Sequence, residues 1–228
     1  MKQSRPGDHL SSSLTDLMTS LMVIFVLLLV SRLNNQAGWR AAAAADLEKR
    51  IQSSVQSYPG DRPVVSRAKD DPNTVVIEIP NTLISFNTQD YTLKPEGQQF
   101  LARIIPDWAN ILCSEQVRPN IDNVVVEGHS DQTRWHNSTF EENKQKNLTL
   151  SQQRSMAIVS GSLSELGNFP VLRDCFLKTL SATGRGEEEP ADPSNPASVR
   201  NRRVVFKIRL RPELANTVAD SLQKATAP

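Results

Sequence analysis

The hydrophobic and polar positions of this 228-residue chain follow three different patterns. Residues 11–33 form a predominantly apolar run, unbroken over residues 21–30, and the whole segment is longer than the ~20 residues that a helix needs to cross the hydrocarbon core of a membrane. Residues 34–60 carry apolar side chains at four-residue spacing, and beyond them strand-like and helix-like patterns alternate. We therefore predict one transmembrane helix, a helical linker and a single folded domain over residues 61–211.

The folded region alternates between the two periodicities of regular structure. Strand patterns occupy residues 75–79, 124–127, 177–183 and 204–210, and helix patterns occupy residues 92–105 and 150–166. The order βαβαββ predicts an α+β sandwich in which helices pack on a sheet. Thr149 and Gln152 have the spacing of a capping box at the start of the second helix, and Gly167 stands just past its end. Residues 212–228 are expected to form a disordered or weakly helical tail.

The linker has a narrow apolar stripe. Leu47, Ile51 and Val55 repeat every four residues, and Asp46 precedes Arg50 by the spacing of a helical ion pair. This pattern predicts that the linker extends the membrane helix and pairs along an apolar seam. The segment Tyr58-Pro-Gly-Asp-Arg-Pro63 should end the helix and mark the domain boundary.

Composition and charge exclude some functions. The net charge is +1, basic residues are scattered, and aromatic residues make up 5% of the chain, so we expect no nucleic-acid partner. Cys113 and Cys175 show no metal-ligand spacing with the histidines, and we expect no metal or cofactor. The two cysteines could form a disulfide in an exported domain, or could be free and buried.

Asp16 lies inside the apolar run. An ionisable group at membrane depth costs roughly 2.5–3.5 kcal/mol and usually faces partner helices, water or a transported ion. Thr19 and Ser20 share its helical face, so these three residues are candidates for ion translocation. Thr19 and Ser20 could instead be small packing residues.

Two other interpretations of this segment stay open. Asp16 could cap the helix in the headgroup region, where the positive N-terminal end of the helix dipole favours a carboxylate. The apolar run could also be a cleaved signal peptide, because Lys2 and Arg5 precede it. Basic residues flank the run on both sides and do not settle its orientation.

Four ordered motifs carry a family resemblance. They are Gly128-His-Ser-Asp131, Asn147-Leu-Thr-Leu-Ser-Gln-Gln-Arg154, Gly184-Arg-Gly-Glu-Glu-Glu-Pro190 and Asn201-Arg-Arg-Val204. Together they resemble the peptidoglycan-binding domain of the OmpA family.

The resemblance implies roles for individual residues. Asp131 and Arg154 would grip the diaminopimelate of a wall peptide, since a zwitterion needs an acceptor for its ammonium and a planar donor for its carboxylate. Asn147 would shape the binding loop, and Arg202 would contact the ligand or brace the site. Alternatively, an Asp131–Arg154 salt bridge only orders the loop. The interval between these two residues is longer than in the minimal family pattern, which indicates an inserted loop.

A membrane helix with an embedded Asp, a linker and an OmpA-like domain resemble MotB-type stator subunits, and more narrowly the ZorB family of Zorya anti-phage defence. That resemblance implies a homodimer enclosed by a MotA-like, ZorA-like pentamer, driven by protons or by sodium ions past Asp16. It places residues 1–10 in the cytoplasm and the domain in the periplasm, bound to peptidoglycan. The alternatives are a flagellar MotB-type stator and a passive tethered wall-binding protein. We expect no enzyme, because three consecutive residues, His129-Ser130-Asp131, cannot form a triad.

Overall fold

We describe the protein from a computed structural model. It describes residues 7–56, 58, 60–87 and 89–211, without the side chains of residues 7–13 and 32–41. The predicted tail at residues 212–228 and most of the predicted cytoplasmic segment lie outside the described residues. By its contacts the chain divides into two compact units, Met1–Ala42 and Ala43–Pro228. Helix α1 (Gly7–Gln56) contributes residues to both units.

The first unit contains the apolar part of α1. Its segment Leu14–Ser31 has a mean hydropathy of 2.2 and is long and apolar enough to cross a membrane. Every side chain of this segment is exposed. An exposed apolar surface of this length suits a lipid environment or partner helices.

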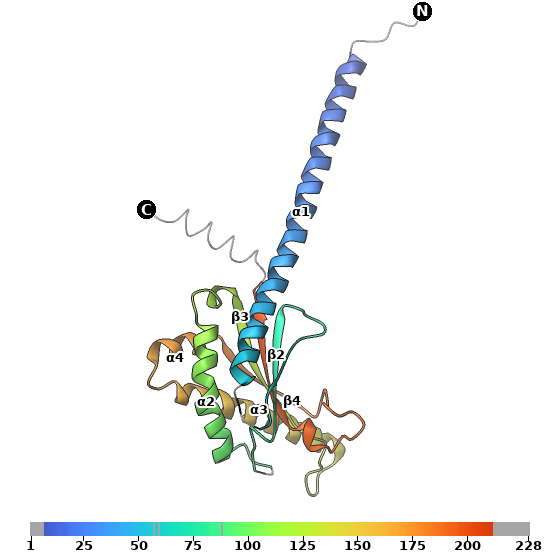
Figure 1. Cartoon of the computed structure of the whole chain (residues 1–228). Coiled ribbons are helices and arrows are strands. Elements are labelled where there is room, and N and C mark those ends of the chain that lie inside the picture. Colours follow the sequence, from blue (N-terminus) through green and yellow to red (C-terminus); the bar gives the residue numbers. More distant parts are fainter. Residues whose placement is uncertain (1–6, 57, 59, 88, 212–228) are drawn as a thin grey trace, which may run out of the picture. The chain divides into compact units, whose positions relative to one another are not determined.

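The second unit is built on a five-stranded sheet (Figure 1). Its strands are β1 (Val64–Arg67), β2 (Thr74–Pro80), β3 (Ile121–His129), β4 (Leu180–Gly186) and β5 (Arg203–Leu210). They are arranged in the order β1-β2-β5-β3-β4, with β3 and β4 parallel and the other neighbours antiparallel.

Three further helices contribute to the core. They are α2 (Pro95–Leu112), α3 (Phe140–Glu165) and α4 (Pro170–Leu177), and short 3-10 turns span Arg118–Asn120 and Val199–Asn201. Phe206 of β5 pairs with Ile77 of β2 and Val126 of β3, so these side chains share the face that packs against the helices. Trp108 of α2 meets Phe206 edge to face at 5.3 Å between ring centroids. This arrangement confirms the predicted α+β class.

The last turns of α1 belong to the folded domain. Leu47, Ile51 and Val55 are buried in the same core as the sheet, and the Trp108 indole N–H donates to Ser54 Oγ at 3.1 Å. The predicted seam is therefore covered by the chain's own domain rather than by another helix. The compact unit begins at Ala43 and not at residue 61, because the apolar stripe of the helix completes the core.

Helix α3 differs most from its prediction. It begins ten residues earlier than residue 150, and its capping box is formed by Thr139 and Glu142 rather than by Thr149 and Gln152. The Thr149 hydroxyl donates to the Gln145 carbonyl within the helix. The Gln152 amide instead bonds β4, donating to the Ala182 carbonyl at 3.2 Å and accepting from the Gly184 N–H at 2.6 Å. Much of the inserted segment is thus helical.

Two elements of the domain were not predicted, β1 and α4. Residue 177, predicted to begin a strand, ends α4, and β4 starts only at Leu180. Cys175 of α4 forms a disulfide with Cys113 at the end of α2, with the two Cα atoms 6.1 Å apart. This bond fastens α4 to α2.

Candidate functional site

The candidate site lies where the end of β3, the start of β5 and helix α3 meet. His129 pairs with Arg203 across the antiparallel β3 and β5, so the segments around Asp131 and Arg202 are neighbours. Helix α3 packs closely on β3 at Gly128, where a Cβ atom would overlap the Ser151 carbonyl. This close approach places Arg154, one turn further along α3, beside the same segments.

Arg154 is buried, and its guanidinium is held by backbone carbonyls. Nε donates to the Asp90 carbonyl at 2.9 Å and Nη2 donates to the Asn87 carbonyl at 3.1 Å. The Phe86 ring lies under the guanidinium, 5.0 Å from its central carbon. Burial lowers the pKa of Arg154 to about 10, and Arg202 acts in the same direction while Asp131 and Asp90 oppose it. The group is a cation at neutral pH whose charge its surroundings disfavour, so an anionic ligand would stabilise it.

Asp131 is ion-paired with Arg202. Its Oδ2 lies 3.6 Å from Arg202 Nε, and its Oδ1 accepts from the Thr133 N–H at 3.2 Å. No Asp131–Arg154 salt bridge forms, because Arg154 is turned toward the β2–α2 loop. The alternative in which that salt bridge orders the loop is therefore wrong.

Asn147 ties the Asp131 loop to the domain. Its Nδ2 donates to the Asp131 carbonyl at 3.3 Å and to Glu187 Oε2 at 3.1 Å, and its Oδ1 accepts from the Trp135 indole N–H at 2.8 Å. Asn143, one turn earlier, accepts from the Trp135 backbone N–H at 2.9 Å. These contacts allow Asn147 to position the loop that carries Asp131. Glu187 and Trp135 were not predicted, although Glu187 stands in one of the four motifs and Trp135 in the inserted loop.

Three arginines surround a small cavity of about 10 Å³. Arg154, Arg202 and Arg203 line it together with His129, and none of its lining residues is acidic. The space suits one water-sized group, such as a single carboxylate oxygen. Burial also lowers the pKa of Arg203, against the opposing effect of Glu78. The cavity is therefore suited to negative charge.

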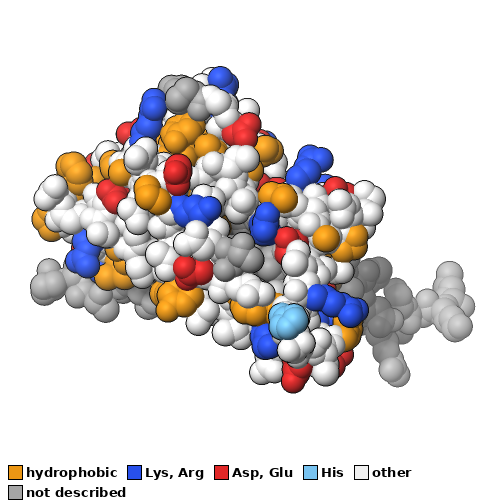
Figure 2. Space-filling model, turned by 90° about the horizontal axis from the view of Figure 1, so that it is seen from below, with side chains coloured by type: hydrophobic (Ala, Val, Ile, Leu, Met, Phe, Trp, Pro, Cys, Tyr) orange, Lys and Arg blue, Asp and Glu red, His pale blue; other side chains and the backbone are white. Residues whose placement is uncertain are grey.

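A second charged cluster lies on the strands behind this cavity. Glu127 Oε2 is 2.8 Å from Lys207 Nζ and 3.7 Å from His129 Nε2. Burial raises the pKa of Glu127, but the nearby His129 ring and Lys207 ammonium outweigh it and lower the pKa to about 2. His129 Nδ1 faces the Glu188 carbonyl at 3.3 Å, so the His129 ring does not serve Ser130 as a base. On the face shown in Figure 2, basic and acidic side chains are interspersed with apolar ones.

The candidates for ion translocation lie on the apolar part of α1. Asp16, Thr19 and Ser20 are exposed on α1. The Thr19 hydroxyl donates to the Thr15 carbonyl at 2.6 Å, so it is occupied within the helix. The Asp16 carboxylate forms no hydrogen bond or ion pair with any residue whose side chain the structure describes.

Comparison with known proteins decides the family. The OmpA family model matches residues 85–203, which is more than half of the chain. The chain belongs to the OmpA family. No curated protein matches it.

Solved structures share the fold of this OmpA-family chain. A MotB-like protein from Desulfovibrio vulgaris is 20% identical with a TM-score of 0.52, and the match covers 77% of this chain and 96% of that one. The periplasmic domain of Helicobacter pylori MotB is 16% identical with a TM-score of 0.50, covering 75% of this chain and 97% of that one. At these identities the likeness concerns the fold.

Proposed function

We propose that the OmpA-like domain binds peptidoglycan through the zwitterionic end of diaminopimelate. Arg154 and Arg202 would receive the carboxylate, and Asp131 would accept from the ammonium. The observation that carries this proposal is the buried Arg154 cation beside a cavity that has three arginines and no acidic lining residue. A bound carboxylate would supply the charge that this cavity lacks.

Binding to whole wall material tests the site. The full chain in detergent should sediment with purified peptidoglycan, and Arg154→Ala should lose this binding. Arg173→Ala is the matched control, because Arg173 is an exposed arginine on α4. Undiminished sedimentation of a folded Arg154→Ala protein would refute the assignment, and free diaminopimelate should compete with the wall for the unaltered chain.

We further propose that the chain is a single-pass inner-membrane subunit with its first ten residues in the cytoplasm and its domain in the periplasm. The apolar segment Leu14–Ser31, the MotB-like fold and the Cys113–Cys175 disulfide support this placement. A homodimer would stand inside a pentamer of a MotA-like partner. Asp16 would accept and release a proton, or a sodium ion, at that interface, while the domain holds the complex to the wall.

The biological setting we favour is anti-phage defence of the Zorya type, with this chain in the role of ZorB and a ZorA-like partner. It rests on the sequence around Asp16, where the aromatic-rich segment usual in flagellar subunits is absent. A flagellar stator predicts a swimming defect on deletion of the gene, whereas defence predicts loss of protection in a phage-plating assay. A passive wall tether predicts that Asp16→Leu has no effect in either assay.

A further inference from the structure

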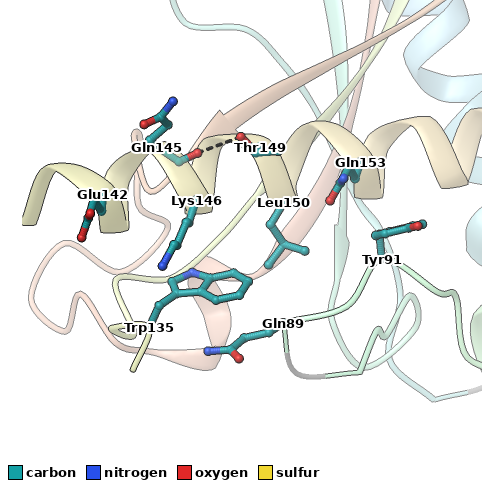
Figure 3. A pocket seen from close by; sticks show the side chains of 9 residues that line it. All are labelled: Gln89, Tyr91, Trp135, Glu142, Gln145, Lys146, Thr149, Leu150 and Gln153. Atoms are coloured by element: carbon teal, nitrogen blue, oxygen red, sulfur yellow. Dashed lines mark hydrogen bonds between the residues drawn. The ribbon is translucent and has the colours of Figure 1, made fainter. Parts of the chain in front are cut away.

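A larger pocket adjoins the Arg154 site, with a volume of about 390 Å³ (Figure 3). It is lined by α3, by the β2–α2 loop and by the inserted β3–α3 loop. The volume falls in the range of about 300–1,000 Å³ that small-molecule sites occupy. The lining residues that matter here are Gln89, Tyr91, Trp135, Lys146, Leu150 and Gln153.

The pocket combines aromatic rings with amides. Trp135 lies below α3, with Leu150 reaching toward it from the helix and Gln89 beneath it, while Tyr91 and Gln153 lie at the other end (Figure 3). The Lys146 ammonium is 5.9 Å from the Trp135 ring centroid and is bonded to the Ser138 hydroxyl at 2.7 Å.

This chemistry suits a sugar better than an anion. The C–H face of a pyranose packs on the electron-rich face of an aromatic ring, and the amides of Gln89 and Gln153 can both donate to and accept from hydroxyl and acetamido groups. The cation at the pocket, Lys146, already has a partner, and Glu142 would repel a carboxylate. A neutral ligand that is polar at its edges and apolar on its faces fits this lining.

The pocket is also mechanically continuous with the Arg154 site. Arg154 holds the carbonyls of Asn87 and Asp90, which bracket Gln89 and adjoin Tyr91. On the other side, Trp135 bonds Asn147, and Asn147 bonds the Asp131 carbonyl. In peptidoglycan two residues separate the diaminopimelate from the sugar, and two extended residues span about 7 Å, so one wall fragment can reach adjoining sites.

We propose that this pocket binds the N-acetylated amino sugar of a wall glycan strand, next to a peptide held by Asp131 and Arg154. The inference rests on the proposed function and names the part of the wall that the second pocket receives. Tyr91 is the residue to test, because its side chain is 51% exposed and forms no hydrogen bond with a described residue. Its truncation should not disturb folding.

Calorimetry on the full chain in detergent tests the proposal with three ligands: the disaccharide–tripeptide, the free tripeptide and the free disaccharide. The unaltered chain should bind the disaccharide–tripeptide about tenfold more tightly than the tripeptide. Tyr91→Ala should weaken the disaccharide–tripeptide about fivefold and leave the tripeptide unchanged. Tyr91→Phe, which keeps the ring, should behave like the unaltered chain.

Two results would overturn the pocket assignment: equal affinity of the unaltered chain for the tripeptide with and without its sugars, or equal weakening of both ligands by Tyr91→Ala. Failure of the proposed function gives a different result. In that case the tripeptide would not bind at all, and the free disaccharide would test the pocket assignment. Binding of the disaccharide that Tyr91→Ala weakens would support the assignment. Absence of disaccharide binding would refute it.

Discussion

Asp16 and Asp131 are two carboxylates in contrasting environments. Asp131 is buried in the domain, with Arg202 as an ionic partner and the Thr133 N–H as a donor. Asp16 stands on an exposed apolar helix with no partner among the described side chains. A buried charge must be compensated, and in the domain the chain compensates it from within. If the apolar segment of α1 crosses a membrane as proposed, the compensation for Asp16 must come from outside, through a partner subunit, water or an ion.

Neutralising Asp16 tests this contrast most severely. Asp16→Asn keeps the shape of the side chain but cannot carry an ion, so under the proposed function ion flux through membranes that contain the chain and the proposed MotA-like partner should disappear. Recovery of the complex in detergent should not change. Thr19→Val is a useful comparison, because the Thr19 hydroxyl already bonds the Thr15 carbonyl and its loss should reduce flux far less. Normal flux through the Asp16→Asn protein would remove the proposed role.

The same substitution at two points of α1 should affect the stability of the domain differently. Ile51 is fully buried in the domain core, whereas Ile24 is 58% exposed. Ile51→Ala should lower the free energy of unfolding of the domain by about 2–5 kcal/mol through lost burial and a residual cavity. Ile24→Ala should leave it unchanged. Urea unfolding in detergent, followed by tryptophan fluorescence, measures both, and equal values would mean that the helix end is not part of the core.

Glu127, a further buried carboxylate of the domain, should make the stability of the fold depend on pH. Its pKa is lowered to about 2 in the folded domain, so its ionised form stabilises the fold above the unfolded value of 4.5. This contribution, on the order of 2–3 kcal/mol, should be lost as the pH falls from about 4.5 to about 2. Glu127→Gln should therefore be less stable than the unaltered chain at pH 7, and the difference should shrink over that window. A difference that is constant with pH would contradict the assignment.

The smallest of these four effects concerns the shape of the cationic side chain at residue 154. Arg154→Lys preserves the charge but loses the planar donor arrangement that serves two backbone carbonyls and, in the proposed function, a ligand. We expect affinity for the wall tripeptide to fall about tenfold, corresponding to about 1.4 kcal/mol. Calorimetry against Arg173→Lys as the control measures it. An unchanged affinity would show that only the charge of residue 154 matters.

Periodicity predicted which faces are apolar, but not what covers them. The stripe at Leu47, Ile51 and Val55 was correctly identified, yet its partner is the domain core, because spacing contains no information on tertiary neighbours. The capping pattern of Thr149 and Gln152 was wrong for a related reason. Thr139 and Glu142 have the same spacing upstream, and the Gln152 amide is engaged by β4.

The motifs name residues that the fold brings close together, but they do not show which of these residues pair. The motifs indicated Asp131, Arg154 and Arg202, but the Asp131–Arg202 pair depends on β3 and β5 being neighbours in the sheet. That strand order is a property of the whole fold. Trp135 lies in the inserted loop, and nothing in a single sequence shows that its indole N–H donates to Asn147.

The Gln152 amide has a consequence beyond the packing of α3. An unpaired edge strand is a template on which another chain can add a strand and begin to aggregate. By accepting from the Gly184 N–H and donating to the Ala182 carbonyl, this one side chain occupies hydrogen-bonding groups of β4 as a neighbouring strand would. Helix α3 thereby protects the β4 edge of the sheet against polymerisation.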